Sequence, residues 1–254
     1  MAEFFYDSEG NPMSLNGTLR DITEQKKEEQ RKDDFMGMIS HELKTPLTSL
    51  KAYLQLLQRM EIGSENSKQQ NMLEKSVKQV NYMNSMINGF LNVSRLDSGQ
   101  MHIEKQLFDM RQLLAEIEQE VLSTNHTRNF IFKLEEEAKV RADWDKISQV
   151  LHNLIGNAIK YSPIETIITV DYANTDDNYL KVNVSDHGIG ISENDQEQIF
   201  QRYYRVKDIN SKTTAGFGIG LYLSKEIIEL HKGIIEVNSS SEKGTVFSFS
   251  LPIN

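Results

Sequence analysis

Residues 143–162, "DWDKISQVLHNLIGNAIKYS", carry a helical pattern in which one face is polar where a core face would be expected. Asn153, Asn157 and Tyr161 follow one another at i, i+4 spacing, and Lys160 lies on the same side. Neutral amide oxygens and a lysine suit a magnesium-bound polyphosphate, because Mg²⁺ takes oxygen ligands and the ammonium group offsets the phosphate charge. Taken alone, such a face is solvated surface more often than a ligand site.

Around this helix the chain alternates between helical and strand-like patterns. Helices are predicted at 109–123, 143–162, 193–205 and 220–232, and strands at 129–135, 166–173, 179–186, 234–240 and 244–252. Turn sequences at 174–178 and 240–244 indicate two hairpins. The pattern therefore predicts an α+β two-layer sandwich, with a mixed sheet and helices on one face, rather than a doubly wound parallel sheet.

Two glycine motifs occur in the same region. In "DHGIGI", Asp186 could accept a hydrogen bond from an exocyclic amine, while Gly188 and Gly190 let the backbone approach a flat ring. "GFGIG" precedes a strong helix at Leu221, whose free N–H groups would meet an anion. The chain contains no Gly-Lys pair, which excludes a Walker-type nucleotide loop.

Upstream, two amphipathic series of apolar residues predict an all-α helical hairpin within residues 35–98. Apolar positions recur in steps of three and four from Phe35 to Leu57, and again after a turn at 61–67. Two such helices cannot bury a wide apolar stripe by themselves. We therefore expect them to pair with a second copy into a dimeric four-helix bundle.

The first of these helices contains the octet "SHELKTPL", residues 40–47. It places His41 beside the carboxylate of Glu42, with Thr45 one turn further on. Proline inside a helix removes a hydrogen bond and bends the helix, at a cost of roughly 3 kcal/mol or more, so Pro46 requires an explanation. Taken by itself, this stretch fits an ordinary helical bundle without chemistry.

The N-terminal residues differ from the rest of the chain. Residues 4–20 contain aromatic residues and a "DSEGNP" turn, which predict a β-hairpin. From Asp21 onward the sequence is charged and free of Gly and Pro, so a helix is expected to begin there, with Asp21 or Thr23 as its cap.

Composition narrows the function further. The 254 residues include no cysteine, so disulfides, thiolate metal sites and a cysteine nucleophile are excluded. The net charge of -9 argues against nucleic acid as a partner, because phosphate binding depends on basic surface. No apolar run approaches the roughly 20 residues needed to cross a bilayer. We expect a cytoplasmic fragment without membrane contact, from a protein that could be anchored upstream.

The order of these motifs resembles that of the cytoplasmic core of bacterial two-component sensor histidine kinases. "FMGMISHELKTPL" resembles the H-box of the family, "HNLIGNAIKYS" its N-box, "DHGIGI" its G1 box, "IFQRYYR" its F-box and "GFGIGLYLSKEII" its G2 box. The resemblance covers residues 35–254. In addition, "NGTLRDITEQKKEEQ" resembles the end of a PAS sensor domain running into a signalling helix.

The resemblance implies four parts. These are a C-terminal remnant of a PAS-like sensor domain at 1–20, a signalling helix at 21–34, a dimerisation and histidine-phosphotransfer hairpin at 35–98, and a catalytic ATP-binding domain of the gyrase and Hsp90 (GHKL) type at 104–254. The implied cofactors are ATP and Mg²⁺. The implied partners are a second copy of the chain and the receiver domain of a response regulator.

The resemblance also implies roles for individual residues. His41 would be phosphorylated, Glu42 would be the acid or base beside it, and Thr45 would orient water for dephosphorylation of the regulator. Asn157 would be the magnesium ligand, with Asn153 as a nearby catalytic contact. The nucleotide would be bound by Lys160, Tyr161, Asp186, Gly188, Gly190, Arg202, Arg205, Gly216, Gly218, Gly220 and Leu221.

The implied chemistry gives a reason for the residues of the octet at 40–47. A free imidazole titrates at about pH 6.5, so it is mostly neutral at pH 7 and can attack the γ-phosphate in line. The carboxylate of Glu42 can accept the other ring proton. A bend at Pro46 could change as upstream helices move, which would expose or hide His41. Residues 206–217 would form a mobile ATP lid, with Phe200 packing against its base.

Two other classes of function remain open. A GHKL-superfamily ATPase or chaperone module would account for Asn157, Asp186 and Gly218 without His41, although the H-box on a hairpin argues against it. A non-catalytic dimeric signalling scaffold would keep the bundle and lose the nucleotide chemistry. The polar residues present in all five boxes argue against that second alternative.

Overall fold

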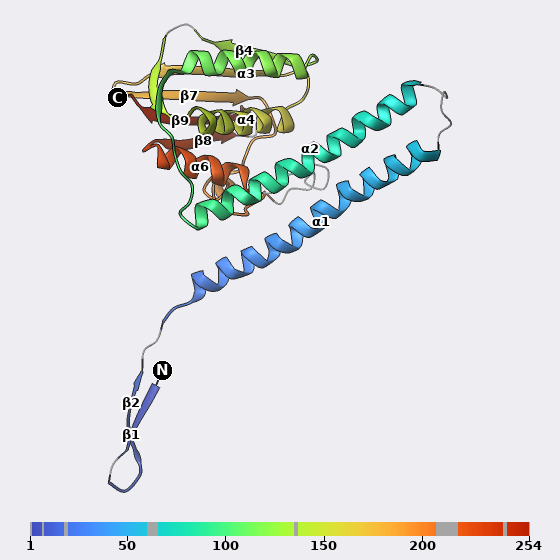
Figure 1. Ribbon diagram of the computed structural model, residues 1–254. Coiled ribbons are helices and arrows are strands. Elements are labelled where there is room, and N and C mark those ends of the chain that lie inside the picture. Colours follow the sequence, from blue (N-terminus) through green and yellow to red (C-terminus); the bar gives the residue numbers. More distant parts are fainter. Residues whose placement is uncertain are drawn as a thin grey trace. The chain divides into compact units, whose positions relative to one another are not determined.

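The structure, a computed structural model, describes the following residues: 2–6, 8–17, 20–59, 66–134, 137–206, 218–240 and 243–253. They form two compact units, residues 1–45 and 46–254, and each unit is described by itself. Figure 1 shows the helices and strands of both units.

The first unit contains a small β-hairpin and the beginning of a long helix. Strands β1 (Ala2–Tyr6) and β2 (Pro12–Gly17) pair in antiparallel fashion, which confirms the predicted hairpin. Its assignment to a PAS domain stays a prediction. Helix α1 (Thr23–Arg59) follows, and the carboxylate of Asp21 accepts a hydrogen bond of 2.8 Å from the N–H of Thr23. Asp21 therefore satisfies a backbone donor that the helix itself leaves free.

The predicted pair of long helices is confirmed. Helix α1 continues through Pro46, and α2 (Asn66–Asp97) is the second helix. Most of the turn predicted at 61–67 lies outside the described residues. Both helices expose large apolar side chains: Leu47, Leu54 and Leu56 of α1, and Leu73, Val77, Val80, Ile87, Phe90 and Leu91 of α2.

The second half of the chain forms a five-stranded mixed sheet in the order β4-β6-β7-β9-β8. The parallel pair is β4 (Asn129–Lys133) with β6 (Ile167–Asn174). The other neighbours are antiparallel and involve β7 (Tyr179–Asp186), β9 (Gly244–Pro252) and β8 (Ile234–Ser240). Residues of β7 alternate between buried and half-buried, so one face of the sheet belongs to the core and the other is open to solvent.

Three helices cover the buried face: α3 (Met110–Thr124), α4 (Trp144–Tyr161) and α6 (Gly220–Leu230) (Figure 1). The core lies between them and the sheet. Its fully buried residues include Ile147, Leu151, Leu154 and Ile155 of α4, Ile227 and Ile228 of α6, and Ile168, Leu180 and Phe249 of the sheet. The α+β two-layer sandwich predicted from the sequence is therefore confirmed.

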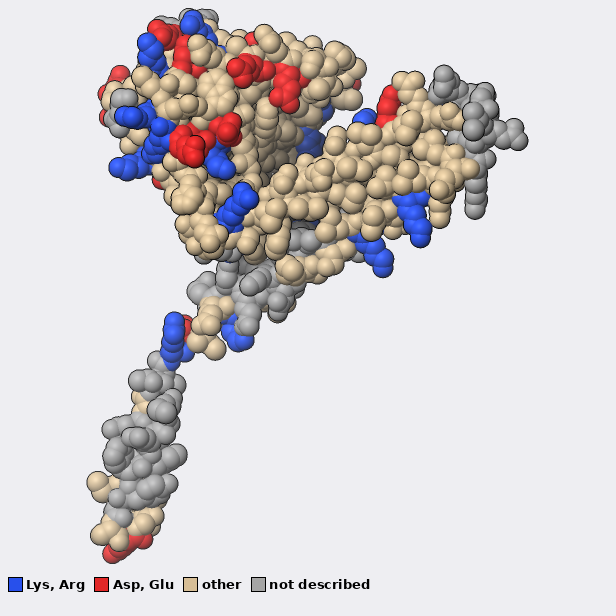
Figure 2. Space-filling model, viewed as in Figure 1, with Lys and Arg blue, Asp and Glu red and all other residues tan. Residues whose placement is uncertain are grey.

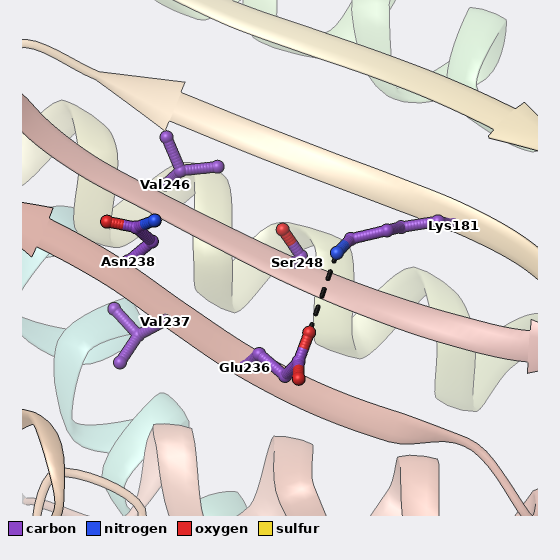
Figure 3. A pocket seen from close by; sticks show the side chains of 6 residues that line it. All are labelled: Lys181, Glu236, Val237, Asn238, Val246 and Ser248. Carbon is purple, nitrogen blue, oxygen red and sulfur yellow. Dashed lines mark hydrogen bonds and ion pairs between the residues drawn. The ribbon is translucent and has the colours of Figure 1, made fainter.

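The open face of the sheet is polar and has a shallow pocket (Figure 3). The Nζ atom of Lys181 lies 3.5 Å from a carboxylate oxygen of Glu236, and the hydroxyl of Ser248 donates a hydrogen bond of 2.8 Å to Asn183. Over the view of this unit in Figure 2, acidic and basic side chains are interspersed. Among the described helices, none combines the length and the apolar character needed to cross a membrane.

Two features of the second unit differ from the predictions. The helix expected at 193–205 is limited to α5 (Glu193–Gln196), because turns follow it and Tyr203 has a left-handed backbone with φ of 65°. The antiparallel pair of β3 (Gln106–Asp109) and β5 (Lys139–Ala142) was not predicted. Each of these strands has four residues, which is too short for an alternating pattern to be recognised.

Candidate functional site

The start of α4 is anchored by a buried histidine at the end of α6. Asp143 caps α4 by accepting a hydrogen bond of 3.1 Å from the N–H of Lys146. The Asp143 N–H donates to Nε2 of His231 at 2.9 Å, and Nδ1 of His231 lies 2.7 Å from the carbonyl oxygen of Ile227. This pattern requires a neutral ring with its proton on Nδ1. Burial accordingly lowers the pKa of His231.

The polar face of α4 meets the start of α6. The side-chain amide of Asn153 donates a hydrogen bond of 2.9 Å to the hydroxyl of Ser224 in α6. Gly220, the first residue of α6, approaches the Asn153 amide so closely that a Cβ atom would clash with it. Asn157 lies one turn further along α4, half-buried, and its side chain makes no hydrogen bond within the described residues. Asn153 is thus fixed, whereas the amide of Asn157 is available to a ligand.

The other end of α4 meets the loop that follows β7. A Cβ atom on Gly188 would lie 2.6 Å from the carbonyl oxygen of Tyr161, so only glycine permits this approach. Asp186 is 5% exposed, and the Gly188 N–H donates to its carboxylate at 2.7 Å. Burial raises the pKa of Asp186, and the Gly188 N–H, the nearby Ser162 hydroxyl and the Thr245 N–H offset part of that effect.

The loop after Asp186 is held by the β8–β9 hairpin. The Ile191 N–H donates to the Ser239 hydroxyl at 2.9 Å, and the Gln196 side chain donates to the carbonyl oxygens of Ile191 and Ser239 at 2.8 and 2.9 Å. Gly190 has a φ of 73°, a conformation in the left-handed region that favours glycine. These hydrogen bonds therefore fix the conformation of the loop that follows Asp186.

Residues 202–204 form a turn after α5 and contact the start of α6. Arg202 donates a hydrogen bond of 2.8 Å to the hydroxyl of Tyr222, and the N–H of Tyr203 donates to the carbonyl oxygen of Gly218 at 3.0 Å. Tyr204 donates to Asp195 at 2.5 Å, and this hydrogen bond raises the pKa of Tyr204 to about 12. The left-handed conformation of Tyr203 is thus supported by contacts on both sides.

Gly218 and Arg205 meet at the same place. With a φ of 62°, Gly218 lies so close to the segment before it that a Cβ atom would be 2.6 Å from the Tyr204 carbonyl oxygen and 3.2 Å from Cγ of Arg205. Phe200 packs edge-on against Phe247 of β9, with ring centroids 6.2 Å apart. Its predicted contact with a lid stays a prediction, because residues 207–217 lie outside the described structure.

The structure brings most of the predicted nucleotide-binding residues to one edge of the second unit. Three groups are directly joined: Asn153 with Gly220, Asp186 and Gly188 with the end of α4, and Gly218 with Arg205. Lys160 donates a hydrogen bond of 2.9 Å to the hydroxyl of Tyr161, so these two side chains contact each other. Leu221 is half-buried in the first turn of α6.

Other predicted residues are not tested by this geometry. Gly216 lies outside the described residues, and so do the side chains of His41 and Glu42, although their backbone belongs to α1. Thr45 is exposed one turn after His41, in the other compact unit. In the described part of the chain, no group of three or more His, Cys, Asp or Glu residues could hold a metal ion.

Sequence reasoning missed three groups at this edge. Ser162 ends α4 beside Asp186, Tyr222 holds Arg202, and the pair of Tyr204 and Asp195 fixes the turn. Tyr204 belongs to the motif "IFQRYYR", which the sequence identified as part of the site. Its partner Asp195 could not be predicted, because their contact forms across a turn where a continuous helix was predicted.

The groups around Asp186 suit an adenine nucleotide by their own geometry. The buried carboxylate of Asp186 can accept a hydrogen bond from an amine, and Gly188 leaves no side chain between that carboxylate and the end of α4. The Asn157 amide is one turn along α4 from Asn153, which contacts Gly220 in the first turn of α6. An amide oxygen and free helix N–H groups are suited to a magnesium-bound polyphosphate.

Two family models match the chain. Residues 31–99 match the His Kinase A (phospho-acceptor) domain, and residues 142–254 match the histidine kinase-, DNA gyrase B- and HSP90-like ATPase. The sensor histidine kinase WalK of Bacillus subtilis is 34% identical over 244 residues, which cover 94% of this chain. The chain spans only 39% of the length of that relative.

Solved structures show the same fold. The histidine kinase AdeS of Acinetobacter baumannii aligns with a TM-score of 0.64 and 21% identity, over 84% of this chain and 98% of that one. The catalytic domain of the histidine kinase ThkA aligns with a TM-score of 0.50 and 30% identity, over 59% of this chain and 95% of that one.

Proposed function

The chain belongs to the sensor histidine kinases, and on that premise we propose that it phosphorylates His41 from Mg-ATP and passes the phosphoryl group to an aspartate of a response regulator. One observation carries the proposal. The buried carboxylate of Asp186, the Gly188 backbone and the polar face of α4 lie together at the edge of the ATPase domain. A helix histidine in an H-box supplies the matching acceptor.

In this proposal the base lies over Gly188 and donates its amine hydrogen to Asp186. Gly190 shapes the same loop, and Lys160 and Tyr161 contact the nucleotide from α4. The phosphates would lie toward Arg202, Arg205 and Leu221, and Gly216, Gly218 and Gly220 would hinge the lid and cradle the phosphates. The free N–H groups at the start of α6 would stabilise the phosphate charge.

Asn157 is the proposed magnesium ligand, because its half-buried amide has no hydrogen bond to any described residue. Mg²⁺ would offset the charge of the phosphates when bound. Asn153 has a different role. Its hydrogen bond to Ser224 links α4 to α6, so Asn153 would help to keep the residues of both helices in position.

The chemistry at the acceptor depends on three residues of α1. A ring nitrogen of His41 would form the bond to the γ-phosphorus while the bond to the leaving oxygen of ADP breaks. Glu42 would accept the proton from the other ring nitrogen. Thr45, exposed one helical turn later, would orient water when the same protein dephosphorylates its regulator.

A homodimer is part of the proposal. The exposed apolar residues of α1 and α2 would be buried against a second copy in a four-helix bundle. The receiver domain of a response regulator would then be the partner, and neither nucleic acid nor membrane contact is proposed for these residues. The reaction is proposed to take place in the cytoplasm, where ATP is available.

The test is transfer of label from γ-labelled ATP in the presence of Mg²⁺. We expect acid-labile, alkali-stable label on the protein and none on the His41→Gln variant, because phosphohistidine has that stability. ATP binding or hydrolysis without label on either protein would instead indicate an ATPase or a scaffold.

A further inference from the structure

The backbone of Ser162 is held in place from both sides. Its N–H donates to the carbonyl oxygen of Ala158 at 3.2 Å, which ends α4. The guanidinium of Arg128 donates to the carbonyl oxygens of Ser162 and Pro163, at 3.0 and 3.2 Å. The position of the Ser162 side chain is therefore determined by contacts that do not involve its hydroxyl.

The hydroxyl of Ser162 is unusual because it is buried and unpaired. The residue is 7% exposed, and its oxygen is the buried side-chain polar atom that lacks a hydrogen-bond partner in the described structure. Burying a hydroxyl without a hydrogen bond costs free energy. Because few buried polar groups in native proteins lack a hydrogen bond, we expect a bound ligand to supply the missing partner of this hydroxyl.

The unpaired hydroxyl lies next to the proposed base site. It is near enough to the Asp186 carboxylate to favour its ionised form, although the two groups make no hydrogen bond of regular geometry. One carboxylate oxygen of Asp186 is already occupied by the Gly188 N–H at 2.7 Å. Tyr161, which precedes Ser162, is the residue that Gly188 approaches. A ligand over Gly188 would therefore meet Asp186 and Ser162 together.

We propose that Ser162 is a specificity-determining residue, which donates a hydrogen bond to a ring nitrogen of adenine while Asp186 accepts from the neighbouring amine. This inference rests on the proposed function, since it deepens the nucleotide site. Adenine offers an amine donor flanked by acceptor nitrogens, which complements a carboxylate beside a hydroxyl. Guanine offers a carbonyl oxygen in place of the amine, and that oxygen would face the carboxylate without a proton between them.

The proposal makes separate predictions for stability and for binding. In Ser162→Ala, the unliganded protein should melt close to the temperature of the parent, because removal of an unpaired buried oxygen offsets the loss of its favourable effect on the Asp186 carboxylate. ATP binding should weaken about 3- to 10-fold, the value of one hydrogen bond, while the weaker binding of GTP changes less. The preference for ATP over GTP therefore falls.

Ser248→Ala is the matched control. Ser248, on the open face of the sheet (Figure 3), is 8% exposed, nearly the same as Ser162. Its hydroxyl, however, donates a hydrogen bond of 2.8 Å to Asn183. Asn183 and Asp186 are three residues apart in β7, so their side chains lie on opposite faces. This variant should melt at a lower temperature and bind ATP as the parent does.

Two measurements on the full chain test whether Ser162 contributes to the preference for ATP over GTP. They are the dissociation constants for ATP and GTP, from titration calorimetry, and the melting temperatures. Analogues of ATP that lack N1 or N7 provide a second test on the ligand side. One of them should bind the parent more weakly than ATP does, and this difference should be smaller in Ser162→Ala.

Each result separates the two proposals. If the parent binds no ATP, the proposed function fails and this inference fails with it. If the parent binds ATP and Ser162→Ala has the same preference over GTP, only this inference is wrong. A melting temperature of Ser162→Ala that falls as far as that of Ser248→Ala would assign the hydroxyl a structural role and overturn the inference.

Discussion

The ATPase region and the helical hairpin use apolar residues in opposite ways. In α4, residues such as Ile147 and Leu154 are completely buried between the helices and the sheet. In α2, by contrast, Leu73 is 53% exposed and Val77 is 56% exposed, although both belong to a regular apolar stripe. The first region closes its core within one chain, whereas the second leaves its apolar stripe exposed for the proposed partner copy. Stability and assembly should therefore respond to different substitutions.

The largest effect is expected from charges within the apolar stripe of α2. Val80→Glu combined with Ile87→Glu should raise the dissociation constant of the proposed dimer at least about 100-fold, because two aliphatic contacts are lost and two carboxylates are desolvated. Sedimentation velocity would measure this change. ATP binding should persist, since the ATPase core is separate from the stripe.

The control places the same charges on another side of α2. Asn71 and Ser85 are exposed and lie roughly a quarter turn or more from the stripe, so Asn71→Glu with Ser85→Glu should leave the dimer intact. Equal dissociation by both double variants would show that net charge, rather than the stripe, controls assembly.

An intermediate effect is expected in the core of the ATPase region. Leu154→Ala should lower its free energy of unfolding by about 2–5 kcal/mol, because the side chain is fully buried. Trp144 is the single tryptophan of the chain and packs edge-on against Phe108 at 4.9 Å, so its fluorescence in urea reports on this region. Leu73→Ala, in the exposed stripe, should leave the tryptophan transition unchanged, and a shift in both variants would contradict the comparison.

A smaller effect is expected from the pH dependence of His231. Burial lowers the pKa of His231 in the folded protein, so the unfolded state binds the proton more readily. The stabilising contribution of the neutral ring is complete above about pH 6.5 and is lost as the pH falls below that value. The urea midpoint, followed by Trp144 fluorescence, should therefore decrease between pH 7.5 and pH 5.5.

The comparison with His231→Gln isolates this contribution. Glutamine does not titrate, so the variant should be less stable at pH 7.5 and should lose less stability on acidification than the parent. Identical pH profiles in the two proteins would show that titrating groups other than His231 dominate the loss of stability.

Much of the fold was predictable because its periodicities are local. The step of three and four residues in α2 and the alternation in β7 both follow from the geometry of a single element. The turn at Tyr203 was not predictable in this way. Its left-handed backbone depends on the Gly218 carbonyl oxygen and its setting is fixed by the Tyr204–Asp195 hydrogen bond.

The candidate site likewise has features that the local sequence predicts and features that depend on long-range contacts. The sequence by itself determined which residue types are present: the amides at Asn153 and Asn157, the acid at Asp186, and the glycines around them, in the order of the family's motifs. Only the tertiary structure decided which of these groups are hydrogen-bonded within the protein. Asn153 is bonded to Ser224, while Asn157 makes no bond to a described residue.

Burial and pairing are set by residues that are distant in the chain, which explains this division. In the sequence, Ser162 is an ordinary residue at the end of a helix. In the structure it is a candidate hydrogen-bond donor to the base, because Arg128 holds its backbone and Asp186 lies beside it. His231 looks like any other histidine until Asp143 donates to it. The sequence specifies the groups, and long-range packing determines which of them are left with a hydrogen bond to offer.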